Sequence, residues 1–189
     1  LMILSSSEHK PVRVALATIH HAVSSISGMI TKELLNQKIM QLAICLNSDF
    51  AVQKPINIAV LSLNPHAGEN GLMGKEELEI IQPTIDRLKS DELQIKGPFA
   101  ADGFFSKEDF REFDGILAMY HDQGLIPVKM LSTGGGVNFT AGLPIVRTSP
   151  DHGVAYSIAG KNTADSSSTW FAVSTAVKIV KNRKKYNSC

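Results

Sequence analysis

The feature that most constrains the fold is a largely aliphatic run from Ile56 to Leu63 that contains no charged side chain. Such runs are typical of central strands in parallel sheets, which are buried on both faces. Similar runs span Val12 to Thr18 and Gly115 to Met119. Between them, apolar residues recur at spacings of three and four over Ile30 to Leu46 and Lys75 to Leu88, which predicts amphipathic helices. Strands that alternate with helices predict an α/β protein with a largely parallel sheet.

The remaining segments are predicted from the same patterns. Leu1 to Leu4, Leu93 to Lys96, Val137 to Thr140 and Ile145 to Thr148 read as short strands, and Lys107 to Phe113 reads as a short helix. Asp165 to Lys181 is expected to be a closing helix with Trp170, Phe171, Val173, Val177 and Val180 facing inward. Pro83 is expected to kink the helix that contains it.

Composition excludes several classes of protein. With 43% hydrophobic and 20% charged residues, the chain has an ordinary globular composition, enough for one domain or two small ones. A net charge of +1 gives no global field that would recruit nucleic acid or an anionic membrane. Cys45 and Cys189 form no zinc-finger or disulfide framework, which favours a reducing, cytoplasmic setting. No apolar run approaches the ~18 residues of a membrane span.

Three histidines each follow a strand-like segment. His20 closes the run that begins at Val14, His66 lies in Leu63 to Gly71, and His121 follows Met119-Tyr120. Open α/β sheets build their sites at the carboxyl ends of strands. Three imidazoles delivered there could hold a divalent metal with positions left open for substrate. An enzyme is therefore the leading hypothesis, and the alternative for each histidine is a structural role at the start of a helix.

Six ordered motifs link the chain to a known family. They are VALATIHH, LNPHAGENGLMGKEE, KGPFAADGFF, AMYHDQGLIPVK, GGGVNFTAGLPIVRTSPDHG and IAGKNTAD. From about Val12 to about Val180, the chain resembles the 4-hydroxythreonine-4-phosphate dehydrogenases of pyridoxal phosphate biosynthesis. Family members are longer, so the resemblance implies a truncated fragment that lacks the first part of the pattern, including a His-Thr pair of the substrate site.

The resemblance also implies a fold and a division into domains. The expected fold is the three-layer α/β fold of the isocitrate and isopropylmalate dehydrogenases. Residues 1–122 would form the central lobe, which binds metal and dimerises. Residues 123–189 would be a return segment that completes the first, cofactor-binding lobe, most of which is missing.

Site residues follow from the same resemblance. His20, His66 and His121 match positions that bind a divalent ion, such as zinc, magnesium or cobalt, at a dimer interface. His21 is adjacent to His20, and the family pattern favours His20 as the ligand. Three further positions match substrate-binding residues. These are Lys129, Asn138 and Arg147.

The nicotinamide site and the proton acceptor are less defined. The chain has no G-x-G-x-x-G fingerprint after a strand. By resemblance to related dehydrogenases, His152 and Gly153 would contact NAD or NADP, although His152 could instead be a fourth ligand or a turn residue. Asp102 and Asp122 are both candidates for the catalytic proton acceptor, and Asp102 could equally be a helix N-cap or turn residue.

The resemblance implies NAD-dependent, metal-assisted oxidation of 4-phosphohydroxy-L-threonine, followed by decarboxylation to 3-amino-2-oxopropyl phosphate. The expected assembly is a homodimer with a shared active site, without nucleic-acid or membrane partners. One alternative is a sister dehydrogenase that acts on 4-phosphothreonate or 4-phosphoerythronate. Another is a non-catalytic fragment that binds metal and dimerises, and the truncated chain alone is expected to be inactive.

Overall fold

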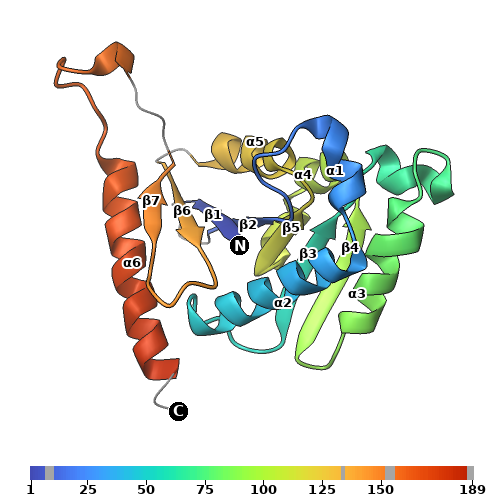
Figure 1. The fold of residues 1–189 in the computed structure, drawn as a ribbon. Coiled ribbons are helices and arrows are strands. Elements are labelled where there is room, and N and C mark those ends of the chain that lie inside the picture. Colours follow the sequence, from blue (N-terminus) through green and yellow to red (C-terminus); the bar gives the residue numbers. More distant parts are fainter. Residues whose placement is uncertain (7–10, 133–134, 152–155, 187–189) are drawn as a thin grey trace.

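The structure is a computed structural model that describes residues 1–6, 11–132, 135–151 and 156–186. These residues form a seven-stranded sheet with helices on both faces (Figure 1). The strands are β1 (Met2–Ser6), β2 (Arg13–Leu16), β3 (Ile56–Leu61), β4 (Leu93–Phe99), β5 (Gly115–Ala118), β6 (Gly136–Thr140) and β7 (Thr148–Pro150). The helices are α1 (Val23–Met29), α2 (Lys32–Ser48), α3 (Gln82–Leu88), α4 (Ala101–Ser106), α5 (His121–Leu131) and α6 (Ser167–Tyr186). Short helical turns are η1 (Pro65–Gly71), η2 (Glu77–Ile81), η3 (Glu108–Glu112) and η4 (Tyr156–Ile158).

The strand order is β4-β3-β5-β2-β1-β6-β7. The first four strands in that order are parallel to one another, as predicted, whereas β1, β6 and β7 pair antiparallel. The sheet is therefore mixed rather than largely parallel. Because the connection between Ser6 and Arg13 is too short for the crossover that parallel neighbours need, β1 turns back on β2 as an antiparallel partner.

Two apolar layers lie on opposite faces of the sheet, because side chains along a strand alternate between its faces. On β5, Leu117 joins a cluster with the buried residues of α2 and α3. Its neighbours Ile116 and Ala118 join the second cluster, under α4 and α5. This α/β arrangement confirms the predicted fold class.

The helix predicted over Lys75 to Leu88 changes its type along its length. It begins as the π-type turn η2 and continues as α3, with Pro83 in the first turn of α3. Proline has no backbone N–H to donate, so it is tolerated at the start of a helix and disrupts the middle of one. The π-type turn ends at Ile81, before Pro83, and the kink expected at this proline stays a prediction.

Helix α5 was not predicted, because Gly124 and Pro127 lower the helix propensity of its sequence. A Cβ atom on Gly124 would lie 2.6 Å from Leu16 Cδ2 and 3.0 Å from Val14 Cγ1. The glycine therefore lets α5 approach β2 closely, and tertiary packing outweighs local propensity.

Helix α6 confirms the closing helix, but four of the five residues predicted to face inward are exposed. The buried residues are Ser168, Ala172 and Ile179, whereas Trp170 is 71% and Val173 51% exposed. Figure 1 shows α6 standing beside β7 at one end of the sheet. Small side chains at Ser168 and Ala172 allow α6 to approach β6 and β7 closely, while Trp170 and Val173 lie on the exposed side of the helix.

The strand predicted over Ile145 to Thr148 is also displaced, since β7 spans Thr148–Pro150. It pairs antiparallel with β6, and Asn138 lies opposite Ser149. The division at residues 122 and 123 stays a prediction. None of the described helices is long and apolar enough to cross a lipid bilayer.

Candidate functional site

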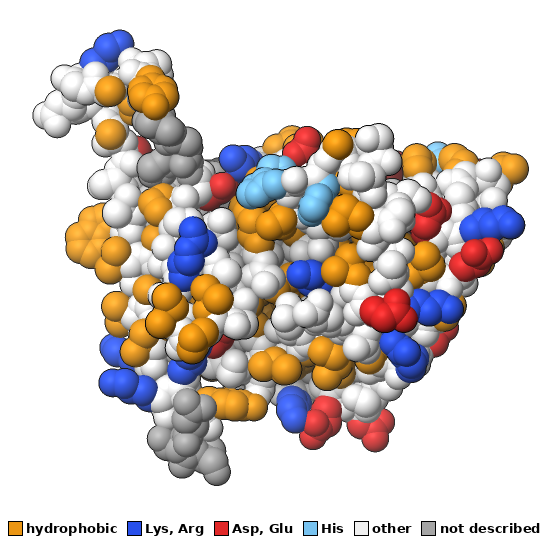
Figure 2. Space-filling model, viewed as in Figure 1, with side chains coloured by type: hydrophobic (Ala, Val, Ile, Leu, Met, Phe, Trp, Pro, Cys, Tyr) orange, Lys and Arg blue, Asp and Glu red, His pale blue; other side chains and the backbone are white. Residues whose placement is uncertain are grey.

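The candidate site lies at the carboxyl edge of three adjacent parallel strands. In the sheet order β3-β5-β2, the segments that follow these strands carry His66, His121 and His20 respectively. Figure 2 shows histidine side chains gathered on one part of the surface, with acidic and basic side chains beside them. Adjacency in the sheet explains why residues far apart in the sequence approach one another here.

His20 and His121 lie together, with their ring centroids 5.7 Å apart. Both line a cavity of about 200 Å³, together with His21, Tyr120 and Asp122. Asp122 Oδ1 lies 2.7 Å from His121 Nδ1. An imidazole that donates from Nδ1 to a carboxylate has the lone pair of Nε2 free for a metal ion. Asp122 is therefore placed to orient His121.

Gln123 fixes the relative positions of two of these strand ends. Its Oε1 accepts a hydrogen bond from Met119 N at 2.7 Å, and its Nε2 donates to Ser62 O at 2.7 Å. Met119 follows β5 and Ser62 follows β3. One side chain in the first turn of α5 thus joins the segments that lead to His121 and His66.

His66 occupies an unusual backbone conformation in η1. From His66 to Asn70, five consecutive residues have φ between 42° and 74°, which is the left-handed region. This conformation costs roughly 1–2 kcal/mol at each residue other than glycine. The His66 side chain is exposed and is not among the residues that line the cavity of His20 and His121. Within the described part of one chain, no three His, Cys, Asp or Glu residues are grouped to hold a metal.

A larger cavity of about 520 Å³ adjoins this region and is lined by His20, Asn138 and Arg147. Arg147 Nη1 donates to Thr140 Oγ1 at 2.8 Å. Asn138 Oδ1 is buried and has no hydrogen-bond partner in the structure. A buried amide oxygen without a partner is costly, so it is a candidate contact for a donor group on a ligand.

Lys38, on α2, lines the same cavity, and the sequence analysis did not identify it. A single lysine on an amphipathic helix has the pattern of a solvated side chain, so the sequence carried no signal for it. Lys129, by contrast, is not among the residues that line this cavity. Its Nζ lies 3.6 Å from Asp151 Oδ1.

The two candidate proton acceptors lie in different places. Asp122 is beside His121. Asp102 is exposed in the first turn of α4, after β4, and is not among the residues that line either histidine cavity. The predicted cofactor contacts His152 and Gly153 lie outside the described residues.

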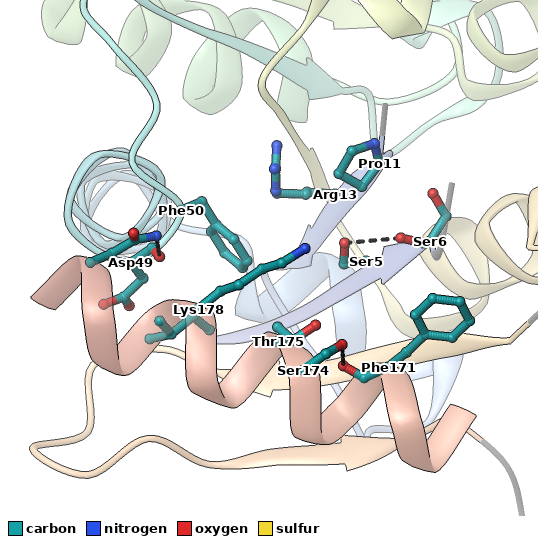
Figure 3. A pocket seen from close by; sticks show the side chains of 12 residues that line it. Ser5, Ser6, Pro11, Arg13, Asp49, Phe50, Phe171, Ser174, Thr175 and Lys178 are labelled. Carbon is teal, nitrogen blue, oxygen red and sulfur yellow. Dashed lines mark hydrogen bonds between the residues drawn. The ribbon is translucent and has the colours of Figure 1, made fainter. Parts of the chain in front are cut away.

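A further cavity, of about 220 Å³, lies at the opposite end of β1 and β2, against α6 (Figure 3). Arg13 and Lys178 line it, and Figure 3 shows Lys178 extending from α6 toward Ser5. Arg13 stacks over the Phe50 ring at 4.7 Å, and burial lowers its pKa from the ordinary value. Among the residues that the structure describes, no histidine lines this cavity, so the pair of His20 and His121 distinguishes the carboxyl edge as the candidate site.

Curated relatives match almost the whole chain. It is 51% identical over 185 residues to a 4-hydroxythreonine-4-phosphate dehydrogenase of Bacteroides thetaiotaomicron, covering 98% of this chain and 50% of the relative. It is 47% identical over 174 residues to the enzyme of the same name in Azoarcus sp., covering 92% of this chain and 52% of the relative. The chain therefore spans about half the length of the curated relatives it matches.

Solved structures give the same picture. A crystal structure of 4-hydroxythreonine-4-phosphate dehydrogenase from Klebsiella pneumoniae superposes with a TM-score of 0.75 at 33% identity, over 96% of this chain and 54% of that one. A terephthalate 1,2-cis-dihydrodiol dehydrogenase from Burkholderia xenovorans gives 0.72 at 26% identity, over 94% and 55%. The family model described as "Pyridoxal phosphate biosynthetic protein PdxA" matches residues 1–176. The chain therefore belongs to the PdxA family.

Proposed function

We propose that this chain forms the metal-binding part of a dehydrogenase that uses NAD or NADP to oxidise 4-phosphohydroxy-L-threonine. Decarboxylation to 3-amino-2-oxopropyl phosphate follows, in the synthesis of pyridoxal phosphate. The observation that carries the proposal is the position of His20. It faces His121 across one cavity and lines the adjoining cavity with Asn138 and Arg147. His20 therefore belongs both to the pair of histidines that could bind a metal ion and to the cavity in which Asn138 and Arg147 could bind an anionic substrate.

The donor set fits a divalent ion such as zinc, cobalt or magnesium. Imidazole suits zinc and cobalt better than magnesium, which prefers oxygen ligands. His20 and His121 are adjacent, and Asp122 is placed to hold His121 with Nε2 available. A bound divalent ion supplies Lewis-acid polarisation of the hydroxyl and carboxylate of the substrate.

The chain's own residues would bind and orient the substrate. Arg147 offers a planar fork of donors that matches a phosphate or carboxylate, and Lys38 adds a second positive charge on the same cavity. Asn138 Oδ1, which lacks a partner, would accept a hydrogen bond from a substrate hydroxyl or ammonium group. Asp122 and Asp102 remain the candidates for the proton acceptor. Lys129 would join the site only if it left Asp151, and His152 with Gly153 would contact the nicotinamide cofactor.

A homodimer would complete the metal site. His66 has an exposed side chain, and the described residues of one chain supply only two of the three histidines to the cavity of His20 and His121. We therefore propose that His66 of a second copy approaches His20 and His121, so that each site is shared. Light scattering would measure the assembly, and a monomer at micromolar concentration would contradict a shared site.

Substrate identity needs a direct assay. The terephthalate dihydrodiol dehydrogenase has the same fold, so the fold does not select the substrate. This chain, joined to the first part of the family pattern from a full-length relative, should reduce NAD with 4-phosphohydroxy-L-threonine faster than with 4-phosphothreonate or 4-phosphoerythronate. Arg147→Lys should raise KM more than it lowers kcat, because it keeps the charge and loses the bidentate fork. Faster turnover of a sister substrate would assign the chain to that activity instead.

A further inference from the structure

Five successive left-handed residues cannot be held by local preference, so the η1 turn requires support from outside. At the end of the turn, Leu72 N donates to Glu69 O at 3.2 Å, and Met73 N donates to Gly68 O at 3.0 Å. Side chains that contact the turn, or the residues just before it, add to this support.

Glu77 supplies that support from η2. Its side chain is buried, with the residue 3% exposed. Oε1 accepts hydrogen bonds from Leu63 N and Asn64 N, both at 2.8 Å. Oε2 accepts from Asn64 Nδ2 at 3.0 Å. The carboxylate thus satisfies two backbone donors immediately before Pro65 and His66, and a buried carboxylate with such partners is a rigid anchor.

Gly68, within the turn, also lies very close to the Glu77 carboxylate. A Cβ atom on Gly68 would lie 2.6 Å from Glu77 Oε2 and 3.2 Å from Gly74 O, and Gly68 has φ of +74°. Only glycine combines this backbone conformation with so close an approach. Glu77 therefore contacts the chain both before and after His66.

Glu76 connects the same turn to the segment that follows His20. Its Oε2 accepts from Asn64 Nδ2 at 2.9 Å, and its Oε1 accepts from Ser27 Oγ on α1. The hydrogen bond from Ser27 is the main reason why the pKa of Glu76 lies below its ordinary value. Asn64, held by both carboxylates, links the His66 turn to α1, which begins shortly after His20.

We propose that Glu77 is a positioning residue that fixes the direction in which His66 leaves the sheet, and thereby sets the affinity of the metal site. The inference rests on the proposed function, in which His66 is a metal ligand. Glu77 itself would not touch the ion. Its two backbone contacts and the Gly68 contact determine where the imidazole can reach.

Cobalt(II) binding tests this role, with visible absorbance as the readout on purified residues 1–189. Glu77→Ala should weaken cobalt binding by about 10- to 100-fold, the range typical of groups that orient a ligand. Glu79→Ala is the matched control, because Glu79 is exposed on the same η2 turn. The double variant His66→Ala/Glu77→Ala should bind no more weakly than His66→Ala, since Glu77 acts through His66.

Glu77→Gln provides a second variant if the alanine change prevents folding. The carboxamide oxygen can still accept from Leu63 N and Asn64 N, so cobalt affinity should fall less than in a folded Glu77→Ala and less than in Gly68→Ala. Circular dichroism checks the fold of each variant. Wild-type affinity in folded Glu77→Ala and Gly68→Ala, or additive losses in the double variant, would overturn the positioning role. Unchanged affinity in His66→Ala would instead contradict the proposed ligand set.

Discussion

At the scale of single residues, the structure distinguishes the two adjacent candidates for a metal ligand, His20 and His21. Both line the two histidine cavities, but the ring contact with His121 is made by His20. The sequence motif favoured His20 over His21, and the structure supplies a geometric reason. The segment after β2 lies beside the end of β5, where Thr18 Oγ1 donates to Met119 O at 2.8 Å, and this brings His20 close to His121.

His20→Ala should therefore lose metal affinity, whereas His21→Ala should keep it. Removing a ligand should lower metal affinity by more than the roughly 10- to 100-fold loss that is typical of removing a residue that only orients a ligand. Isothermal titration with zinc would measure both variants, each compared with the wild type. Equal losses in the two variants would show that the ring contact does not distinguish the ligand.

Sequence reasoning placed all three histidines after strands but did not predict the reach of His66. Its direction depends on Glu77, eleven positions later in the chain, and on a left-handed turn that no periodic pattern encodes. Asn138 and Arg147 were identified only through the resemblance of their motifs to the family. No feature of the sequence indicated that Lys38 lines the same cavity. The sequence did not predict these positions because they depend on contacts between segments that are far apart in the chain.

At the scale of elements, α6 is fastened to the end of α2 by an ion pair. Arg183 Nε donates to Asp49 Oδ1 at 2.6 Å and Nη2 donates to Oδ2 at 3.2 Å, in a fork-like arrangement. The side chains are 22% and 5% exposed. Nothing in the sequence pattern indicated that Arg183 would pair with Asp49. Periodicity predicted α2, α3 and α6 but not α1, α4 or α5, and it carried no information on this contact between distant segments.

Arg183→Met should destabilise the fold by about 3 kcal/mol, because it leaves the buried Asp49 carboxylate without its partner. The double variant Asp49→Asn/Arg183→Met should lose less, since both charges are removed. Urea unfolding followed by circular dichroism would measure the free energies. Lys181→Met, an exposed position on the same helix, should stay within about 0.5 kcal/mol of wild type. Equal stability of Arg183→Met and the control would show that the ion pair contributes little.

At the scale of the whole molecule, the two ends of the sheet differ in how much apolar surface they expose. The outer side of α6 exposes Trp170, Val173 and Val177, and the curated relatives are about twice as long as this chain. By contrast, the strand ends that carry the histidines are surrounded by two well-packed layers on the faces of the sheet. The histidine end therefore has its own core, whereas the end at α6 leaves an apolar surface uncovered.

Residues 1–189 alone should accordingly bind metal but show almost no turnover, whereas a full-length relative should reduce NAD. Hydride transfer requires the substrate carbon and the nicotinamide to be held within about 3–3.5 Å, and a displacement of ~1 Å can cost roughly 100-fold in rate. Lys129 is paired with Asp151 away from the cavity of Asn138 and Arg147, so the substrate residues are not all assembled. Parallel assays of NADH formation and cobalt binding, on both proteins, would separate the two properties. NADH formation by residues 1–189 within about ten-fold of the full-length rate would mean that this half already holds substrate and cofactor at reacting distance.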